Sequence, residues 1–226
     1  MASEIRVTTI GSKAGLGTIT FSATGQDITG ITTIANLNIS DTYRNTPIGE
    51  NSGNSFTVGS AIDNTLVGYD AGTAITTGDY NTVVGSYALD ANTTGTSNNA
   101  FGYGALGANT TANDNTAVGH VALTLNTTGD KNAAFGKGAL SANTTGANNT
   151  GVGYHALDLN TTGSSNVAIG YNSLDANTTA SNNTAIGANA LNSDTTGTSN
   201  VAVGKNALAT QTTADDNTAV GYYAGG

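Results

Sequence analysis

The fold is decided by the stretch from Asn81 to Ser97, which reads N-T-V-V-G-S-Y-A-L-D-A-N-T-T-G-T-S. Its pattern returns every 17 residues, and a glycine recurs ten times from Gly68 to Gly221 with no insertion or deletion. A fixed short period is typical of a solenoid, in which each repeat forms one coil. Four residues before each glycine stands an asparagine: Asn64, Asn81, Asn98, Asn115, Asn132, Asn149, Asn166, Asn183, Asn200 and Asn217.

Each repeat contains two short apolar segments and a turn signal. The first segment, such as Val83-Val84, precedes the repeat glycine, and the second, such as Ala88-Leu89, follows it by three residues. The tetrapeptide at 92–95, N-T-T-G, favours a turn because Asn and Gly tolerate left-handed dihedral angles. We therefore predict an all-β parallel β-solenoid (a β-roll) of about ten 17-residue coils. Each coil would have two short strands and two corners, and coils would stack about 4.8 Å apart.

Two adjacent columns of the repeat are apolar, and adjacent residues of a strand face opposite sides. We predict that the larger side chains pack inside the coil with the leucines. This core comprises Val84, Phe101, Val118, Phe135, Val152, Ile169, Ile186, Val203, Leu89, Leu106, Leu140 and Leu174. A strand that is apolar on both faces needs a second cover, so we predict a homotrimer. Its interface would be the alanine column, Ala100, Ala117, Ala134, Ala168, Ala185, Ala202 and Ala219.

The asparagine column predicts a ladder at one corner of the coil. Stacked identical amides can hydrogen-bond along the rod and satisfy backbone groups at the corner. A repeated ligand site would need carboxylates in one column, and we interpret Asp90, Asp158, Asp175 and Asp194 as scattered. The column is therefore expected to be structural.

Residues 1–62 do not keep the period, and 63–226 form the predicted repeat shaft. Alternating segments at 4–10, 17–22 and 27–34, separated by turn signals, predict a small β-rich attachment module. Residues 41–53 hold the only proline, Pro47, and are interpreted as a linker or collar, while 55–59 would be a degenerate first coil. Because the last coil ends without a polar cap, we expect further chain or another subunit to follow it.

Composition excludes several classes of function. Only 9% of the residues are charged and the net charge is −9, so no basic surface is present for nucleic acid. No run is apolar enough to insert in a membrane, and the first residues lack the features of a signal peptide. The absence of cysteine fits synthesis in a reducing cytoplasm.

No catalytic, cofactor or metal constellation stands out in the sequence, and we expect no enzyme. His120 and His155 occupy different positions of coils two steps apart, and we interpret both as surface residues. Tyrosines follow several repeat glycines, for example Tyr69, Tyr103 and Tyr171. Exposed rings at regular spacing stack on sugars, but we favour their covering the groove of a neighbouring copy of the chain.

Two family resemblances rest on these motifs. The pentapeptides at 166–170 (N-V-A-I-G) and 200–204 (N-V-A-V-G) resemble the head repeats of trimeric autotransporter adhesins, which form a trimeric β-roll. The longer string at 115–129, N-T-A-V-G-H-V-A-L-T-L-N-T-T-G, resembles repeats of phage tail fibres and tailspikes that precede endosialidase-type chaperone domains. The opening M-A-S-E-I-R-V-T-T-I resembles the N-termini of virion proteins from marine tailed phages.

The resemblance implies a virion structural protein, a homotrimeric tail fibre or related appendage made in the host cytoplasm. Its expected partners are copies of itself, other virion or baseplate proteins through the N-terminal module, and a host-surface glycan or protein. A trimeric cell-surface adhesin head is the alternative. A polysaccharide depolymerase would need a fixed pair of carboxylates in a groove, which the repeat columns do not supply.

Overall fold

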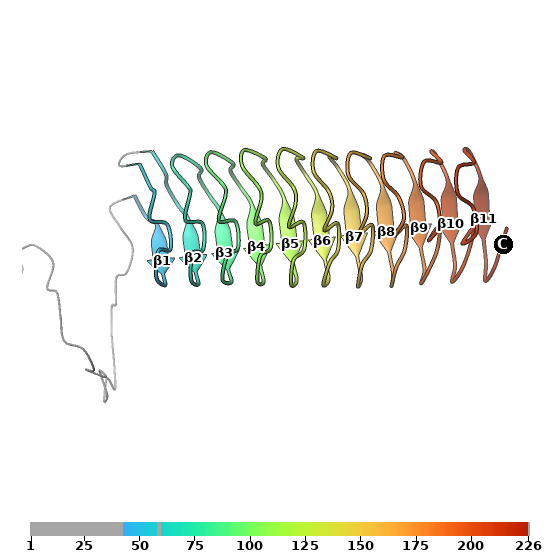
Figure 1. The fold of residues 1–226 in the computed structure, drawn as a ribbon, viewed down its shortest axis with the longest axis horizontal. Coiled ribbons are helices and arrows are strands. Elements are labelled where there is room, and N and C mark those ends of the chain that lie inside the picture. The colour runs from blue at the N-terminus through green and yellow to red at the C-terminus, as the bar shows by residue number, and fades with distance from the viewer. Residues whose placement is uncertain (1–42, 58–59, 226) are drawn as a thin grey trace, which may run out of the picture. The chain divides into compact units, whose positions relative to one another are not determined.

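The computed structural model describes residues 43–57 and 60–225, which belong to one compact unit, Asn38–Gly226 (Figure 1). Eleven three-residue strands form a single sheet in chain order, and every neighbouring pair is parallel. The predicted all-β parallel solenoid with a 17-residue coil is confirmed. The strands are β1 (Thr46–Ile48), β2 (Thr65–Val67), β3 (Thr82–Val84), β4 (Asn99–Phe101), β5 (Thr116–Val118), β6 (Ala133–Phe135), β7 (Thr150–Val152), β8 (Val167–Ile169), β9 (Thr184–Ile186), β10 (Val201–Val203) and β11 (Thr218–Val220).

Equivalent residues of successive coils lie directly over one another. Ala100 of β4 is opposite Ala117 of β5, which is opposite Ala134 of β6, and the same register holds along the stack. Figure 1 shows the consequence, a row of near-identical coils with their strands side by side. Each column of the sequence repeat is therefore a column of side chains in space.

Each coil contains one strand rather than the predicted two. The segment with the leucine is a turn, because its leucine has a left-handed backbone, with φ of 50° at Leu89 and 55° at Leu106. Bonds between coils persist there, since the N–H of Leu89 donates to the carbonyl of Ala105 at 2.9 Å. A left-handed leucine costs roughly 1–2 kcal/mol. Burial of its whole side chain contributes about 2 kcal/mol and offsets that cost.

The two faces of the strand are the reverse of those predicted. The central residue of each strand faces inward, and the predicted interface alanines are the buried ones: Ala100, Ala117, Ala134, Ala168, Ala185 and Ala202 are inaccessible and Ala219 is 8% exposed. The predicted core residues Val84, Phe101, Val118, Phe135, Ile169 and Ile186 are 37–43% exposed, and Val152 and Val203 are half-buried. Leu89, Leu106, Leu140 and Leu174 do form the core.

The reason for this reversal is the width of the coil. Its interior already holds a leucine and a further alanine from the opposite turn, such as Leu140 and Ala139 of one coil. Only a small strand residue fits against them at the close-packed density of protein interiors. The large branched and aromatic residues therefore point away from the coil, where no such limit applies.

The repeat glycine permits the close approach of neighbouring coils. Gly136 has a φ of 135°, in the region that favours glycine, and a Cβ there would lie 2.4 Å from the carbonyl oxygen of Gly153. An alanine in this column would thus clash with backbone that cannot move aside. This geometry explains why the glycine recurs without exception from Gly68 to Gly221.

The solenoid begins earlier than the predicted boundary after residue 62. Asn45 is a buried member of the asparagine column, and β1 pairs with β2, so residues 45–53 are coil rather than linker. This coil is two residues longer than the others, which obscures it in the sequence. The N–H of Thr57 donates to the carbonyl of Thr76, 19 positions on, whereas the N–H of Ile62 donates to Asp79, 17 positions on. The two extra residues therefore lie between Thr57 and Ile62. The predicted N-terminal β-rich module lies outside the described residues.

The proline that suggested a linker occupies a permitted place. Pro47 lies in β1, the first strand in the sheet order, opposite Leu66. Proline has no N–H to donate and is therefore found on edge strands. Across residues 43–57 and 60–225, no helix is long and apolar enough to cross a membrane.

Candidate functional site

One outward-facing apolar residue per coil forms a continuous stripe along the solenoid. We call it the apolar column; it comprises Ile48, Val67, Val84, Phe101, Val118, Phe135, Val152, Ile169, Ile186, Val203 and Val220. Parallel pairing spaces its members about 4.8 Å apart. Contiguous exposed apolar surface of this extent marks an interaction site more often than chance. This column is therefore a candidate interface.

Aromatic rings gather on the turn that follows the repeat glycine. Tyr69, Tyr87, Tyr103 and His120 form a chain of contacts with ring centroids 5.4–5.7 Å apart. In a second group, Tyr154 stacks on Tyr171 with centroids 5.6 Å apart, and Lys137 lies over the Tyr154 ring at 5.8 Å. These tyrosines are 39–54% exposed. Such rings offer flat apolar faces to a ligand outside the coil.

The predicted asparagine ladder is present and lies inside the coil. Each amide oxygen from Asn45 to Asn200 accepts the backbone N–H of the next asparagine in the column, at 2.8–3.1 Å. The amide nitrogen of Asn132 donates to the carbonyl of Gly146 at 2.8 Å, which closes the coil. We call this column the first amide ladder. Its members are buried along the stack, so it is structural.

A second amide ladder, not predicted, is formed by the asparagine of the N-T-T segment: Asn92, Asn109, Asn126, Asn143, Asn160 and Asn177. Here each amide nitrogen donates to the amide oxygen of the preceding coil, at 2.7–3.0 Å. It also donates to the carbonyl three residues on, as Asn143 does to Gly146. The signal was visible in the sequence as a second 17-residue asparagine period, which turn propensity alone had explained.

The second amide ladder is interrupted where Asp194 replaces asparagine. Asp194 is fully buried, and its Oδ2 has no hydrogen-bond partner. The amide oxygen of Asn177, which would accept from an asparagine there, is also unpartnered. Burial raises the pKa of Asp194 to about 6; the N–H of Gly197 opposes the shift and the charge of Asp215 adds to it.

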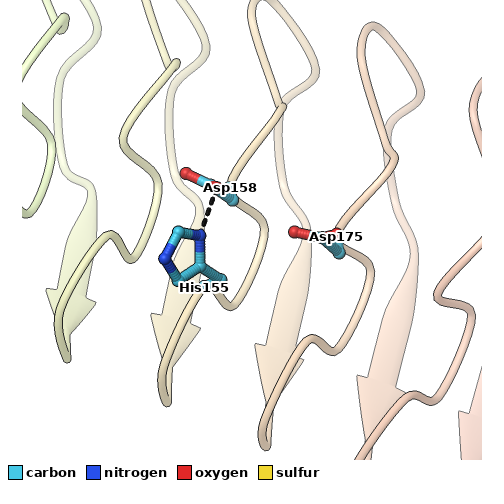
Figure 2. Close-up of side chains that lie close together, drawn as sticks. All are labelled: His155, Asp158 and Asp175. Carbon is cyan, nitrogen blue, oxygen red and sulfur yellow. Dashed lines mark hydrogen bonds and ion pairs between the residues drawn. The ribbon is translucent and has the colours of Figure 1, made fainter.

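The described residues contain one group of three titratable side chains with metal-ligand chemistry: His155, Asp158 and Asp175 (Figure 2). The prediction that the aspartates are scattered is wrong for three of the four. Asp90, Asp158 and Asp175 occupy the same position of the 17-residue repeat, and Asp158 and Asp175 lie in successive coils. The hydroxyl of Ser141, in the same column, donates to Asp158 rather than to His155. A nucleophilic triad needs the hydroxyl on the imidazole, so these contacts do not build one.

Comparison of the chain with family models, with curated proteins and with solved structures finds no match. The β-solenoid itself rests on the strand pairing described above. The resemblances to tail fibres and to adhesins rest on the quoted motifs.

Proposed function

We propose that this chain is the shaft of a virion appendage, a phage tail fibre or related fibre that acts as a rigid spacer for host attachment. The observation that supports it is the unbroken hydrogen bonding of eleven parallel strands with identical columns. Each coil is tied to the next by backbone bonds and by the first amide ladder, and the coils from Asn92 to Asn177 also by the second, so bending would strain many bonds at once. A structure of this kind holds its two ends at a fixed distance.

The proposed fibre is a homotrimer whose chains meet along the apolar column, in place of the alanine face. A second copy is the partner that fits this stripe, because its own column has the same spacing of about 4.8 Å and keeps step over every coil. A partner of different period would fall out of register within a few residues. Phe101 and Phe135, at 38% and 43% exposed, are the largest side chains that such an interface would cover.

Two attachments are proposed, one to the virion and one to the host surface. The N-terminal residues would bind other virion or baseplate proteins, and the exposed aromatic groups offer a surface for a host glycan or protein. Protein would be made in the host cytoplasm and reside in the virion. Several copies per particle would convert weak contacts into avidity.

The test is the solution mass of the purified chain, measured by light scattering. We expect about three times the chain mass of 22.3 kDa. In a double variant, Phe101→Glu and Phe135→Glu, charges on the interface should reduce the mass to that of one chain with an unchanged circular dichroism spectrum. The matched control, Thr111→Glu and Thr145→Glu, changes exposed positions of the same two coils and should keep the trimer.

A single-chain mass for the unaltered protein would overturn the trimer. Alanine variants such as Ala168→Arg do not test the interface, because they place a charge inside the coil. The alternative proposal, a trimeric adhesin head, is supported by the N-V-A-I-G motif at 166–170. Labelling with an antibody against residues 63–226 separates the two: virions bind it if the chain is a fibre, and cell surfaces if it is an adhesin.

A further inference from the structure

Three ligand-type side chains converge on one face of the stack, midway along its length (Figure 2). His155 and Asp158 lie in the turn after β7, and Asp175 lies in the equivalent turn after β8. One ligand atom from each lies within 4.8 Å of the other two. The Nδ1 of His155 is 2.5 Å from the Oδ2 of Asp158, and the carboxylate of Asp175 points toward this pair in the figure.

The three side chains line a hollow of about 180 Å³, together with Tyr154, Leu159 and Asn172. Asn172 supplies an independent sign that a ligand is expected. Its amide oxygen has no access to solvent and accepts no hydrogen bond from the described residues. A buried amide oxygen left without a partner costs about 1–3 kcal/mol, and a rotation of the amide that turned this oxygen into the hollow, onto a bound cation, would remove that cost.

The charges around the hollow are unbalanced. Two carboxylates, Asp158 and Asp175, face a single imidazole, and the nearby Lys137 lies over the Tyr154 ring. The site therefore favours an added positive charge.

We propose that His155, Asp158 and Asp175 bind a divalent transition-metal ion of the Zn²⁺ class. One imidazole nitrogen with two carboxylate oxygens is a donor set that Zn²⁺ accepts, whereas Ca²⁺ and Mg²⁺ prefer oxygen donors alone. Ligand atoms of a tetrahedral zinc site lie roughly 3.4 Å apart, given bonds near 2.1 Å. The three donors, already within 4.8 Å of one another, lie close to that separation.

The ion would act as a staple between coils. Two of its ligands come from one coil and the third from the next, while Ser141 of the preceding coil holds Asp158 in place. A fourth position remains for water or for the Asn172 amide oxygen. Because the ligands belong to separate coils, binding requires the folded stack and stabilises it.

The experiment is calorimetric titration of the full chain with Zn²⁺, after removal of metal with EDTA. We expect one ion per chain, and at least a tenfold loss of affinity in Asp175→Asn and in His155→Gln. His120→Gln is the matched control, because His120 is the other histidine and stacks on Tyr103 away from the cluster. It should bind Zn²⁺ as the unaltered chain does.

Hydrogen exchange gives a second measurement that does not depend on affinity. Zn²⁺ should slow amide exchange in peptides covering 155–175 of the unaltered chain and leave the same peptides unchanged in Asp175→Asn. Absence of stoichiometric binding, or equal binding by Asp175→Asn, would overturn the proposal. The outcome is independent of the trimer, since all three ligands belong to one chain.

Discussion

The two amide ladders pass through the same coils and meet at the same carbonyls, yet only one of them is asparagine at every step. Gly146 accepts from both Asn132 of the first ladder and Asn143 of the second. The first ladder is asparagine in all its coils from Asn45 to Asn217. The second gives way to Ile75 at one end and to Asp194 and Gln211 at the other.

The difference follows from what each amide oxygen accepts. In the first ladder it accepts a backbone N–H, which every coil presents and which no apolar side chain can satisfy. In the second it accepts the amide of a like residue, so both partners can be replaced together. Replacing both partners of a buried hydrogen bond by apolar groups is nearly neutral, whereas removing one leaves the other unsatisfied.

The largest effect is expected from Asn132→Ala, which breaks the first ladder in the middle of the stack. The backbone N–H of Asn149 would lose its acceptor, now 2.9 Å away, and would remain buried. We expect a loss of about 3 kcal/mol from the orphaned donor and the cavity. Denaturant unfolding followed by circular dichroism measures it, and a loss below about 1 kcal/mol would contradict the role assigned to the backbone contact.

A smaller loss, about 2 kcal/mol, is expected from Asn143→Ala in the same coil. Gly146 keeps its bond from Asn132, and Asn160 keeps its bond to Gly163. The groups left without a partner are the oxygen of Asn126 and the second amide N–H of Asn160, and no backbone group is orphaned. The same unfolding measurement applies, with the exposed Thr145→Ala as control. Equal losses for Asn132→Ala and Asn143→Ala would remove the distinction between the ladders.

Asp194→Asn should stabilise the chain by about 1 kcal/mol at neutral pH, because it restores a donor to Asn177 and removes a buried charge. The pKa of Asp194 is raised from 3.8 to about 6 in the folded state. Its contribution to stability is therefore complete below about pH 4 and is lost as the pH rises through about 6. The advantage of the variant should grow over that range in pH-dependent unfolding. A constant difference would show that the carboxyl does not titrate there.

The smallest effect is expected from Asn92→Ile, which extends the apolar end of the second ladder by one coil from Ile75. Asn109 would keep its bond to Ala112, and Gly95 its bond from Asn81, so only the second amide N–H of Asn109 loses its acceptor. Burial of the isoleucine side chain offsets part of that cost. We expect a change of less than about 1 kcal/mol. A loss as large as that of Asn143→Ala would mean that the amide chain is cooperative along its length.

The parallel solenoid and the length of its coil could be predicted from the sequence, because the 17-residue period has no insertion or deletion from Asn64 onward. The burial of the leucine column and the hydrogen bonding of the asparagine column could be predicted for the same reason. The faces of the strand were not predictable in the same way. Val118 and Ala117 are both apolar, so hydrophobicity has no preference for which lies inside, and the width of the coil decides. The first coil was not recognised in the sequence because two extra residues place Asn45 out of the 17-residue period.

The candidate metal site was missed for a different reason. Asp90, Asp158 and Asp175 share one column of the repeat, but most coils carry a different residue there, so the column does not stand out in the sequence. Ser141, Asp158 and Asp175 are its successive members. His155 reaches that column from three residues away in the same turn. Only the left-handed backbone of the turn, with φ of 50° at His155 and 57° at Leu157, brings the imidazole back toward it.

The register of the stack makes the length of the solenoid a matter of whole units. Deleting or duplicating 17 codons would rejoin Asn to Asn and Gly to Gly, and would shorten or lengthen the coil stack by one step of about 4.8 Å. An insertion of one codon inside a strand would set alanine against valine in that coil alone, because the coils on either side keep their own 17-residue spacing. Unequal recombination between repeats is thus a route by which the gene can change the length of the solenoid one coil at a time and keep the register of the stack.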